Sequence, residues 1–262
     1  MIYFDAVAEE YDRREADNPV MQLMRKRSLE ILDSTFSVGS TLLDVGCGTG
    51  TEAIWLGQRG RTMFAVDSSS RMLEVLARRA SAADVRISTR LLRAGDLMAL
   101  AEELGDASLD GAYSSFGALN TEAALAPPLA ALSRLVRPGG RIVLGVMNRW
   151  CVAEMALLAA SGRVKQALRR TRPSVTVGVG ANSIKVSYPS WRRLRRALRP
   201  RFRVVSLEAL PLVLLPYAWP AFSAHPRMYR TVTRLDQGLA RRRPFAWLGD
   251  HLLVVAERRG LR

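Results

Sequence analysis

A glycine-rich turn preceded by an acid is the stretch of this chain best suited to bind a ligand. The turn is Gly46-Cys47-Gly48-Thr49-Gly50, and Asp44 stands two residues before its first glycine. Glycine permits backbone angles that a side chain forbids, and it lets a ligand approach the free N–H groups of a helix start. The acid would repel a diphosphate but can accept from an ammonium group. The pattern therefore favours a zwitterionic amino-acid moiety, with an ordinary nucleotide or structural turn as the alternative.

Two further acids follow apolar runs that we expect to be strands. Asp67 ends the run 61–67 and lies 21 residues beyond Gly46, where a carboxylate can accept from both hydroxyls of a ribose. Asp96 belongs to the expected third strand, 91–97, and is suited to accept from the exocyclic amine of a purine. With Asp44, these acids predict a site for an adenosyl-amino-acid.

Alternating strands and helices are expected to position these acids. The strand runs and the amphipathic runs between them follow one another throughout residues 41–147, which predicts a parallel sheet with helices on both faces. A further helix is expected before the sheet, at 20–32. The expected strands are 41–45, 61–67, 91–97, 109–117 and 141–147, and the helix between the last two is expected at 122–136.

The remainder of the chain is less regular. An apolar, proline-broken run at 210–222 is too short to span a bilayer and lies in a 43-residue connection, which suggests a lid. No internal repeat or separate second domain is evident. The other expected elements are a helix at 149–172, a strand pair at 175–179 and 184–188, a basic helix at 191–198, a strand at 202–207 and a closing strand at 251–256.

The net charge of +15 is concentrated in one part of the chain. Residues 1–148 carry 16 basic and 19 acidic residues, residues 149–203 carry 14 and 1, and residues 204–262 carry 9 and 4. Such a localised field attracts anionic partners, for example phospholipid, an acidic carrier protein or RNA. The alternative is compositional, because 36 of the 39 bases are arginine.

Length and cysteine content indicate the general class of protein. The 262 residues suit one α/β domain with an elaboration, and 48% apolar residues can build a core. Two cysteines, Cys47 and Cys151, argue against a disulfide framework or a metal cluster. Because no secretory signal is recognised at the amino terminus, we expect a cytoplasmic protein, with membrane-peripheral contact as an extension of that expectation.

These motifs, in this order and spacing, resemble the class I (Rossmann-like) S-adenosylmethionine-dependent methyltransferases that act on small molecules. The resemblance covers residues 1–148 and the closing strand, and it is specific for the cofactor but not for the acceptor. Its pieces are Phe4-Asp5-x-x-Ala8-x-x-Tyr11-Asp12, Leu43-Asp44-Val45-Gly46-Cys47-Gly48-Thr49-Gly50, Asp67-x-Ser69-x-x-Met72-Leu73, Gly95-Asp96-Leu97 and Leu135-x-Arg137-Pro138-Gly139-Gly140.

The resemblance implies how S-adenosylmethionine would be held. Asp44 and the backbone of Gly46, Cys47, Gly48 and Gly50 would bind the methionine part, Cys47 being a small packing residue of the turn, with Tyr11 over the carboxylate. Further positions are assigned to the sugar, the base and the sulfonium. Asp67 beside Ser68 would take the ribose, Met72 would lie against the adenine, Gly95, Asp96 and Leu97 would surround its amine, and Ser115 and Phe116 would line the loop next to the sulfonium.

The resemblance also implies a doubly wound, seven-stranded, mostly parallel sheet whose last strand is antiparallel. We expect a single methyltransferase domain over residues 1–262. Its parts would be a helical cap (1–40), a cofactor-binding core (41–148), a substrate-side elaboration with a lid (149–249) and the closing strand (250–262).

The catalytic side chains are less well indicated than the cofactor site. Methyl transfer is an in-line displacement that gains from alignment of the reactants and, for a hydroxyl acceptor, from a base. His225 in the lid is the first candidate base, ahead of His251, which we expect to be structural. Asn120 could orient an acceptor or cap a loop, and Tyr188 is a further candidate whose alternative is core packing.

The acceptor is expected to be a small, hydrophobic or amphipathic molecule, because the run 212–222 is apolar and arginines lie near it in sequence. An anionic or lipid-like acceptor would suit both features.

No metal is expected. Two alternatives remain open: an RNA methyltransferase that uses the basic stretch 149–203, and a protein that binds S-adenosylmethionine without turnover. RNA is disfavoured because Ser114-Ser115-Phe116-Gly117 stands where base-amine methylases usually carry Asn/Asp-Pro-Pro-aromatic.

Overall fold

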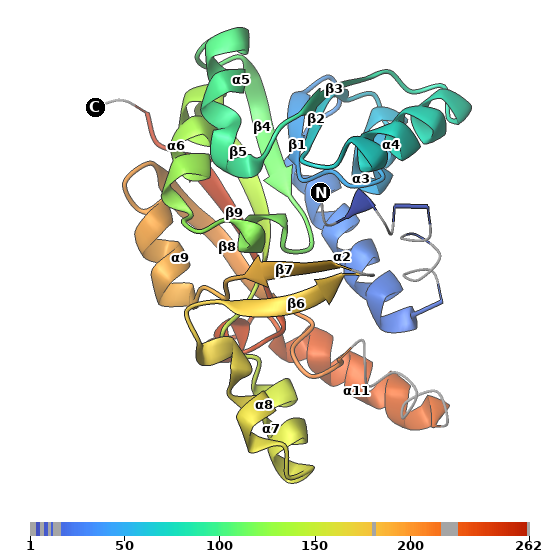
Figure 1. The fold of residues 1–262 in the computed structure, drawn as a ribbon, viewed down its shortest axis with the longest axis vertical. Helices are drawn as coiled ribbons and strands as arrows, with labels where there is room; N and C mark the ends of the chain where they lie inside the picture. Colours follow the sequence, from blue (N-terminus) through green and yellow to red (C-terminus); the bar gives the residue numbers. More distant parts are fainter. Residues whose placement is uncertain are drawn as a thin grey trace.

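A computed structural model describes residues 4–5, 8–9, 12, 17–179, 182–215 and 225–260. Its centre is a seven-stranded sheet with the order β3-β2-β1-β4-β5-β9-β8 (Figure 1). β9 pairs antiparallel with β5 and β8, while the pairs among β1 to β5 are parallel, so the predicted fold class is confirmed. The strands are β1 (Thr41–Val45), β2 (Thr62–Asp67), β3 (Ile87–Leu91), β4 (Leu109–Ser114), β5 (Val136–Met147), β8 (Phe202–Leu210) and β9 (His251–Arg258).

Helices cover both faces of this sheet because successive strand residues point to opposite sides. On one face α5 (Leu97–Leu104), α6 (Ala126–Leu135) and α9 (Trp191–Leu198) pack on residues such as Leu144 and Val254. On the other, α2 (Pro19–Thr35) and α3 (Thr51–Gly57) pack on Val143 and Leu253. The remaining elements are α4 (Ser70–Ala82), α7 (Val152–Ala160), α8 (Val164–Ala167), α11 (Pro226–Leu239), the hairpin β6 (Val175–Val179) and β7 (Asn182–Val186), and short 3-10 turns at Ala94–Asp96, Ala118–Thr121, Arg169–Thr171 and Phe245–Trp247.

One edge of the sheet collects the loops that can form a site. β1, β4 and β5 run in the same direction and end there, and antiparallel β9 begins there, with His251 opposite Met147. The chain leaves β1 toward β2 on one side, and β4 lies on the other side of β1. Such a reversal of strand order opens a crevice at the carboxyl ends of the strands, which is where open α/β sheets bind ligands.

Two element predictions were wrong in their bounds. The third strand is Ile87–Leu91, not 91–97, and Asp96 lies in the 3-10 turn that follows. The apolar pair Leu91-Leu92 suggested a buried strand, but Leu91 is exposed on this outermost strand. The helix expected at 149–172 is divided into α7, α8 and a 3-10 turn, because Gly162 adopts a positive φ of 73° and ends the first helical piece.

Other boundaries shift by a few residues. The helix expected at 122–136 begins at Ala126, with prolines in its first turn, and β5 already begins at Val136. The second hairpin strand is Asn182–Val186 instead of 184–188, and the strand expected at 202–207 continues to Leu210. The helix Trp191–Leu198 agrees with the prediction. α11 was not predicted, because its sequence was assigned to the lid connection.

The run expected to form a lid is core in the part that the structure describes. Leu210, Leu212, Leu214 and Leu215 are all buried. The carboxylate of Asp236 on α11 accepts from the backbone nitrogens of residues 212, 213 and 214 at 2.5–3.1 Å and holds this segment in place. Residues 216–224 lie outside the described residues. The leucines of the described half therefore belong to the core, while Val213 is 42% exposed.

Within the described ranges, none of the helices is both long enough and apolar enough to cross a membrane.

Candidate functional site

The glycine turn joins β1 to α3 through three glycines with positive φ, as the sequence predicts. A Cβ on Gly46 would lie 2.2 Å from the Cβ of Ala118, and one on Gly50 would lie 2.5 Å from Leu76 Cγ. These two positions need glycine because other chain segments pack against them. At Gly48 no atom of the described residues lies within 4 Å of the added Cβ, so this glycine is not packed against them. The open side of the turn is where a ligand can approach the backbone.

Asp44 is a buried carboxylate with an unused acceptor. It is 2% exposed, and Oδ2 has no hydrogen-bond partner of good geometry among the described residues, although the buried Tyr113 hydroxyl lies beside this carboxylate. Burial, and next the negative charge of Glu52, raise the pKa of Asp44 well above its ordinary value, and the Tyr113 hydroxyl acts in the opposite direction. A cation placed beside Oδ2 would relieve both effects. The ammonium group of a bound amino-acid moiety is such a cation, so Asp44 fits the methionine end of S-adenosylmethionine.

Asp67 at the end of β2 is fixed by backbone donors on two elements. Gly48 N donates to Oδ2 and Ser69 N donates to Oδ1, each at 2.9 Å. Burial raises the pKa of Asp67, and these N–H groups oppose that rise. Each oxygen keeps a second lone pair, so the fixed carboxylate can still accept from the two hydroxyls of a ribose. Ser68 beside it is partly buried.

The described parts of the amino-terminal leader lie against this site. Thr49 Oγ1 in the turn donates to Asp12 at 2.8 Å, and Ser69 Oγ donates to Asp5 at 2.5 Å. Met72 is 2% exposed and packs with Ala8 of the leader. Tyr11, predicted to cover the methionine carboxylate, lies outside the described residues, so that prediction stays open.

The predicted adenine residues lie on a turn between β3 and α5. Asp96 is exposed, and Leu97 is fully buried as the first residue of the helix. Gly95 packs closely on the Glu122 carboxylate, 2.7 Å from the position of an added Cβ. The role of Asp96 at the adenine amine stays a prediction, because no hydrogen bond or ion pair within the described part of the chain orients this exposed carboxylate.

The loop after β4 carries an aromatic ring in a strained position. Phe116 has a φ of +50°, which is unusual for a bulky residue. Its ring lies between the guanidinium of Arg25, 5.0 Å from the ring centre, and the imidazole of His251, 6.3 Å away and nearly perpendicular. Arg25 also pairs with buried Glu52 at 2.5 Å. Ser115 precedes the ring and is partly buried.

A second polar cluster lies behind this loop, where the sequence analysis placed no site. Asp250 is 7% exposed; its Oδ2 lies 2.9 Å from His251 Nδ1 and its Oδ1 accepts from Arg170 at 2.6 Å. Burial acts to raise the pKa of Asp250, but His251 and Arg170 outweigh it and hold that pKa well below its usual range. Arg170 also pairs with Glu154, and Arg169 bonds the same carboxylate at 2.5 Å.

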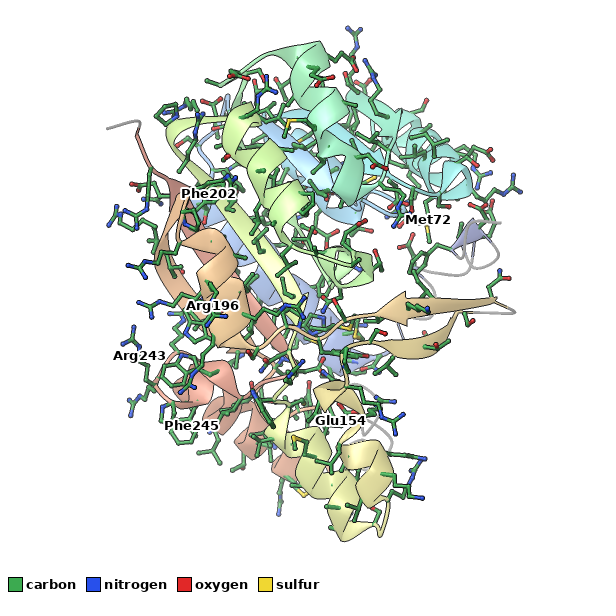
Figure 2. All side chains as sticks on the ribbon, turned by 60° about the vertical axis from the view of Figure 1, so that its left-hand side comes forward. Met72, Glu154, Arg196, Phe202, Arg243 and Phe245 are labelled. Atoms are coloured by element: carbon green, nitrogen blue, oxygen red, sulfur yellow. The ribbon has the colours of Figure 1, made fainter. Side chains whose placement is uncertain are left out.

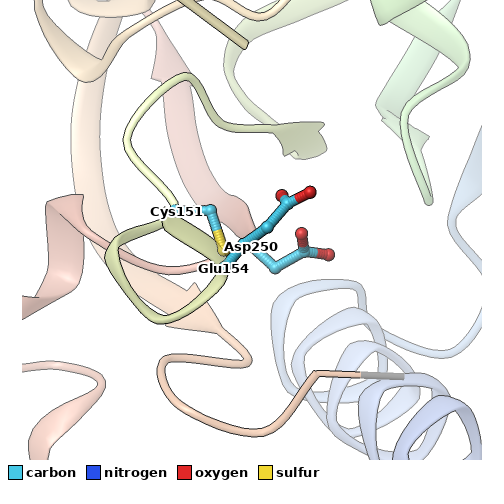
Figure 3. Close-up of side chains that lie close together, drawn as sticks. All are labelled: Cys151, Glu154 and Asp250. Atoms are coloured by element: carbon cyan, nitrogen blue, oxygen red, sulfur yellow. The ribbon is translucent and has the colours of Figure 1, made fainter. Parts of the chain in front are cut away.

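Three side chains of this cluster approach the spacing of metal ligands. Figure 3 shows Cys151, Glu154 and Asp250 together, and their ligand atoms lie within 4.8 Å of one another. Burial raises the pKa of Cys151 to about 12, which keeps the thiol protonated. Arg170 pairs with both carboxylates and Arg169 pairs with Glu154, so two guanidinium groups balance the two acids. The donor set is therefore explained as a buried ion-pair network around arginine.

Of the three predicted catalytic residues, Asn120 is bonded to Ser187, the neighbour of Tyr188, and neither of them has a described contact with His225. Asn120 is fully buried; its amide donates to Met147 O and Ser187 O and accepts from Met147 N, all within 3.0 Å. Tyr188 is buried under Arg170, whose guanidinium lies 5.0 Å from the ring. His225 is exposed just before α11. His251, expected to be structural, is the histidine that reaches the loop beside the cofactor site.

A hollow of about 770 Å³ lies along the outer strand β8, away from this site. Eight arginines and Glu208 are among the residues that line it. In Figure 2, Phe202 and Arg243 of this wall lie on the opposite side of the molecule from Met72. β4, β5 and β9 separate β8 from the glycine-turn strand β1. The hollow is therefore distinct from the cofactor site.

Comparison with known proteins agrees with this geometry. Residues 42–140, which contain the glycine turn, Asp67 and Asp96, match the family described as methyltransferase domain. The chain carries a class I methyltransferase domain. The cofactor of this domain class is S-adenosylmethionine, and the open acceptor of Asp44 and the uncovered Gly48 fit it.

Relatives of this methyltransferase domain include enzymes of quinone biosynthesis. The demethylmenaquinone methyltransferase of Renibacterium salmoninarum is 34% identical over 142 residues, covering 54% of this chain and 55% of that protein. The ubiquinone biosynthesis O-methyltransferase of Alkalilimnicola ehrlichii is 29% identical over 114 residues, covering 42% and 43%. The chain thus spans about half the length of the curated relatives it matches, or less.

A solved structure extends the likeness to the whole fold. The 1,6-didemethyltoxoflavin-N1-methyltransferase of Burkholderia thailandensis, with S-adenosylhomocysteine and 1,6-didemethyltoxoflavin bound, has a TM-score of 0.58 at 20% identity. The match covers 98% of this chain and 86% of that chain. At this identity the likeness shows the fold of the methyltransferase domain and its elaboration.

Proposed function

We propose that this protein transfers a methyl group from S-adenosylmethionine to a small, largely apolar acceptor with an ionisable hydroxyl or acidic ring carbon. The observation that carries the proposal is the buried Asp44 carboxylate with a free Oδ2, next to the open face of Gly48 and the fixed carboxylate of Asp67. This arrangement offers separate partners to the ammonium group and the ribose of the cofactor. Bound there, the cofactor supplies an electrophilic methyl group, and alignment of the acceptor provides much of the rate.

Two observations support an apolar acceptor. Phe116 presents an aromatic ring at the carboxyl edge of β4, and the neighbouring core of Leu210 and Leu214 makes that side of the sheet apolar. The names of the relatives point to quinone-ring substrates in those proteins. A planar ring with a hydroxyl combines an apolar body with a proton that must leave during transfer.

Calorimetry with S-adenosylhomocysteine tests the cofactor part of the proposal. We expect binding by the wild-type protein and a loss of affinity of about tenfold or more in Asp44→Asn, which exchanges a charge-assisted hydrogen bond for a neutral one. Leu91→Ser, on the exposed outer strand β3, is the matched control and should bind as the wild type does. Equal affinity of Asp44→Asn and wild type would contradict the assignment of the site.

A methylation assay with two probes tests the acceptor class. Tritiated S-adenosylmethionine is offered with 1,4-naphthoquinol, which presents ring carbons and hydroxyls, and with 3,4-dihydroxybenzoate, which adds a carboxylate. Transfer to either probe supports a ring acceptor, and preference for the first supports an apolar one. Transfer to neither, with transfer to bulk RNA in the same assay, would favour the RNA alternative.

We propose further that the α7–α8 segment contacts an anionic membrane surface, from which an apolar acceptor could reach the enzyme. This segment projects beyond the sheet (Figure 1). Val152, Leu157, Val164 and Leu168 are 44–54% exposed on it, among the exposed bases of residues 163, 165 and 169. Its one acid, Glu154, is buried. Exposed apolar side chains surrounded by bases are typical of interfacial helices.

Vesicle co-sedimentation tests this contact. We expect binding to vesicles of phosphatidylglycerol and phosphatidylcholine, weaker binding to pure phosphatidylcholine, and a loss in Leu157→Asp. Leu91→Asp adds the same charge at an exposed leucine on β3 and is the control. Equal loss in both variants, or binding that ignores the anionic lipid, would contradict the proposal.

A further inference from the structure

His251 lies at the edge of the sheet that carries the cofactor loops. β9 runs antiparallel, so its first residue meets the last residue of β5, Met147. On the same edge, the loop after β4 passes over the glycine turn, where Ala118 touches Gly46. The His251 imidazole stands 6.3 Å from the Phe116 ring of that loop. An acceptor that lies beside the methyl group over β4 and β5 would therefore be near this imidazole.

The orientation of the imidazole is set by Asp250. Nδ1 lies 2.9 Å from Oδ2 of this carboxylate. Asp250 stays ionised, since the contacts with His251 and Arg170 lower its pKa despite its burial. An ionised carboxylate can only accept, so the proton of neutral His251 lies on Nδ1. Nε2 then carries a free lone pair, and no hydrogen bond to Nε2 is found among the described residues.

Asp250 is itself held in place by Arg170 and by the chain segment that precedes it. Its Oδ1 accepts from Arg170 at 2.6 Å, and the same guanidinium donates to Asn148 O at 3.2 Å. The Asn148 amide donates to Trp247 O at 2.8 Å and to Gly249 O at 3.0 Å, which fixes the chain just before the acid. Glu154 also pairs with Arg170 and is shared with Arg169, which supplies the second positive charge of this cluster.

The charged and titratable groups around His251 are otherwise few. Asp250 and Arg170 face it from its own strand and from the segment after α8, and Arg25 stands on the far side of Phe116. Cys151 stays a protonated thiol and Tyr188 a neutral phenol, because burial raises the pKa of both. None of these competes with Nε2 for a proton at neutral pH.

We propose that His251, oriented by Asp250, is the base that accepts the acceptor's proton during methyl transfer. This inference rests on the proposed function. In the step, the acceptor O–H bond breaks, and an electron pair of the resulting oxyanion, on oxygen or delocalised onto a ring carbon, forms the new bond to the methyl carbon. When a ring carbon is methylated, its hydrogen afterwards moves to the oxygen. The bond between methyl and sulfur breaks, its electrons return to sulfur as S-adenosylhomocysteine, and the proton goes to Nε2. The imidazolium then releases it to water. His251 is the catalytic residue and Asp250 the positioning residue.

Nitrogen NMR tests the orientation without any acceptor. The chain has two histidines, so His225→Gln leaves His251 as the sole imidazole. In this background, long-range ¹H–¹⁵N spectra at alkaline pH should show the proton on Nδ1. Adding Asp250→Asn should shift the population toward the Nε2–H form, because the amide no longer favours an Nδ1 donor. An Nε2–H imidazole in the His225→Gln protein would overturn the proposal.

Kinetics tests the base itself with the probe that the wild type methylates. We expect His251→Ala to lose about 10²–10⁴-fold in kcat with unchanged affinity for S-adenosylhomocysteine. Added imidazole should restore part of kcat in His251→Ala, which a merely structural histidine would not allow. Wild-type kcat in His251→Ala would overturn the inference. If the wild type methylates neither probe while it binds the nucleoside, the acceptor proposal fails and the NMR result alone decides the base.

Discussion

The glycine turn and the region around β9 treat their acids differently. Beside the turn, Asp44 leaves an oxygen without a partner and Asp67 is held by backbone N–H groups alone, whereas Glu52 next to them pairs with Arg25. In the region around β9, Glu154, Glu208 and Asp250 each pair with one or two arginines, and Asp236 is held by backbone N–H groups. A buried carboxylate with a protein cation stabilises the fold or orients a neighbour. One without a cation can bind a charged ligand.

This contrast indicates that some arginines of the basic half have a structural role. Arg170 is buried and pairs with two acids, and Arg241 reaches Glu208 together with Arg27 of α2. Other bases, such as those of residues 192 and 193 on α9, stay exposed and set the surface field. The positive charge of this half therefore comes from two groups: a few arginines that pair with buried acids, and many arginines that lie on the surface.

The largest expected effect is the loss of a buried cation. Arg170→Met should destabilise the protein by about 3–5 kcal/mol, because Asp250 and Glu154 would be left buried without their cation. Urea unfolding measures the change. Arg203→Gln, which breaks the exposed pair with Glu257, is the control and should cost less than about 1 kcal/mol. Similar costs for both variants would remove the distinction between the two classes of arginine.

Asp44→Asn should have opposite effects on stability and binding. Without ligand we expect a higher melting temperature near pH 7, because the asparagine is not penalised for burial as an ionised carboxylate is. S-adenosylhomocysteine should then raise the melting temperature of the variant less than that of the wild type. Thermal unfolding with and without the nucleoside measures both. If Asp44→Asn were less stable than the wild type without ligand, and gained as much stability from the ligand, Asp44 would not be an unpaired acid that binds the ligand.

The pH dependence of stability should differ in sign between Asp44 and Asp250. The pKa of Asp44 is raised in the fold, so its contribution becomes less favourable as pH rises above the ordinary carboxyl value. The pKa of Asp250 is lowered, so its contribution is present above that value and is lost as pH falls below it. The stability differences between wild type and Asp44→Asn or Asp250→Asn, measured from pH 3 to 8, should therefore change in opposite directions. Parallel curves would refute the comparison.

The smallest effect is expected at Gly48. Alanine there meets no atom of the described residues within 4 Å, so the positive φ of 52° is the term that opposes it, at a cost of about 1–2 kcal/mol. Nucleoside affinity should fall more than stability, because the added methyl group projects into the open side of the turn. Urea unfolding and calorimetry on Gly48→Ala separate the two. Unchanged affinity would show that no ligand approaches this backbone.

The sequence by itself determined the cofactor half. Glycine spacing, acids after apolar runs and the alternation of strands and helices are local signals, and they predicted the turn, Asp44, Asp67 and the sheet. Boundaries were less certain where an outer strand such as Ile87–Leu91 is exposed, or where Gly162 divides a helical run.

Only the tertiary structure decided which polar residues of the second half act together. Arg170 and Asp250 are 80 residues apart and meet because β9 inserts beside β5, and this insertion also brings His251 to Phe116. Asn120 is similarly occupied by backbone groups of residues 147 and 187. Spacing along the chain carries no information on such contacts, because they arise from strand order and from burial that forces each charge to find a partner.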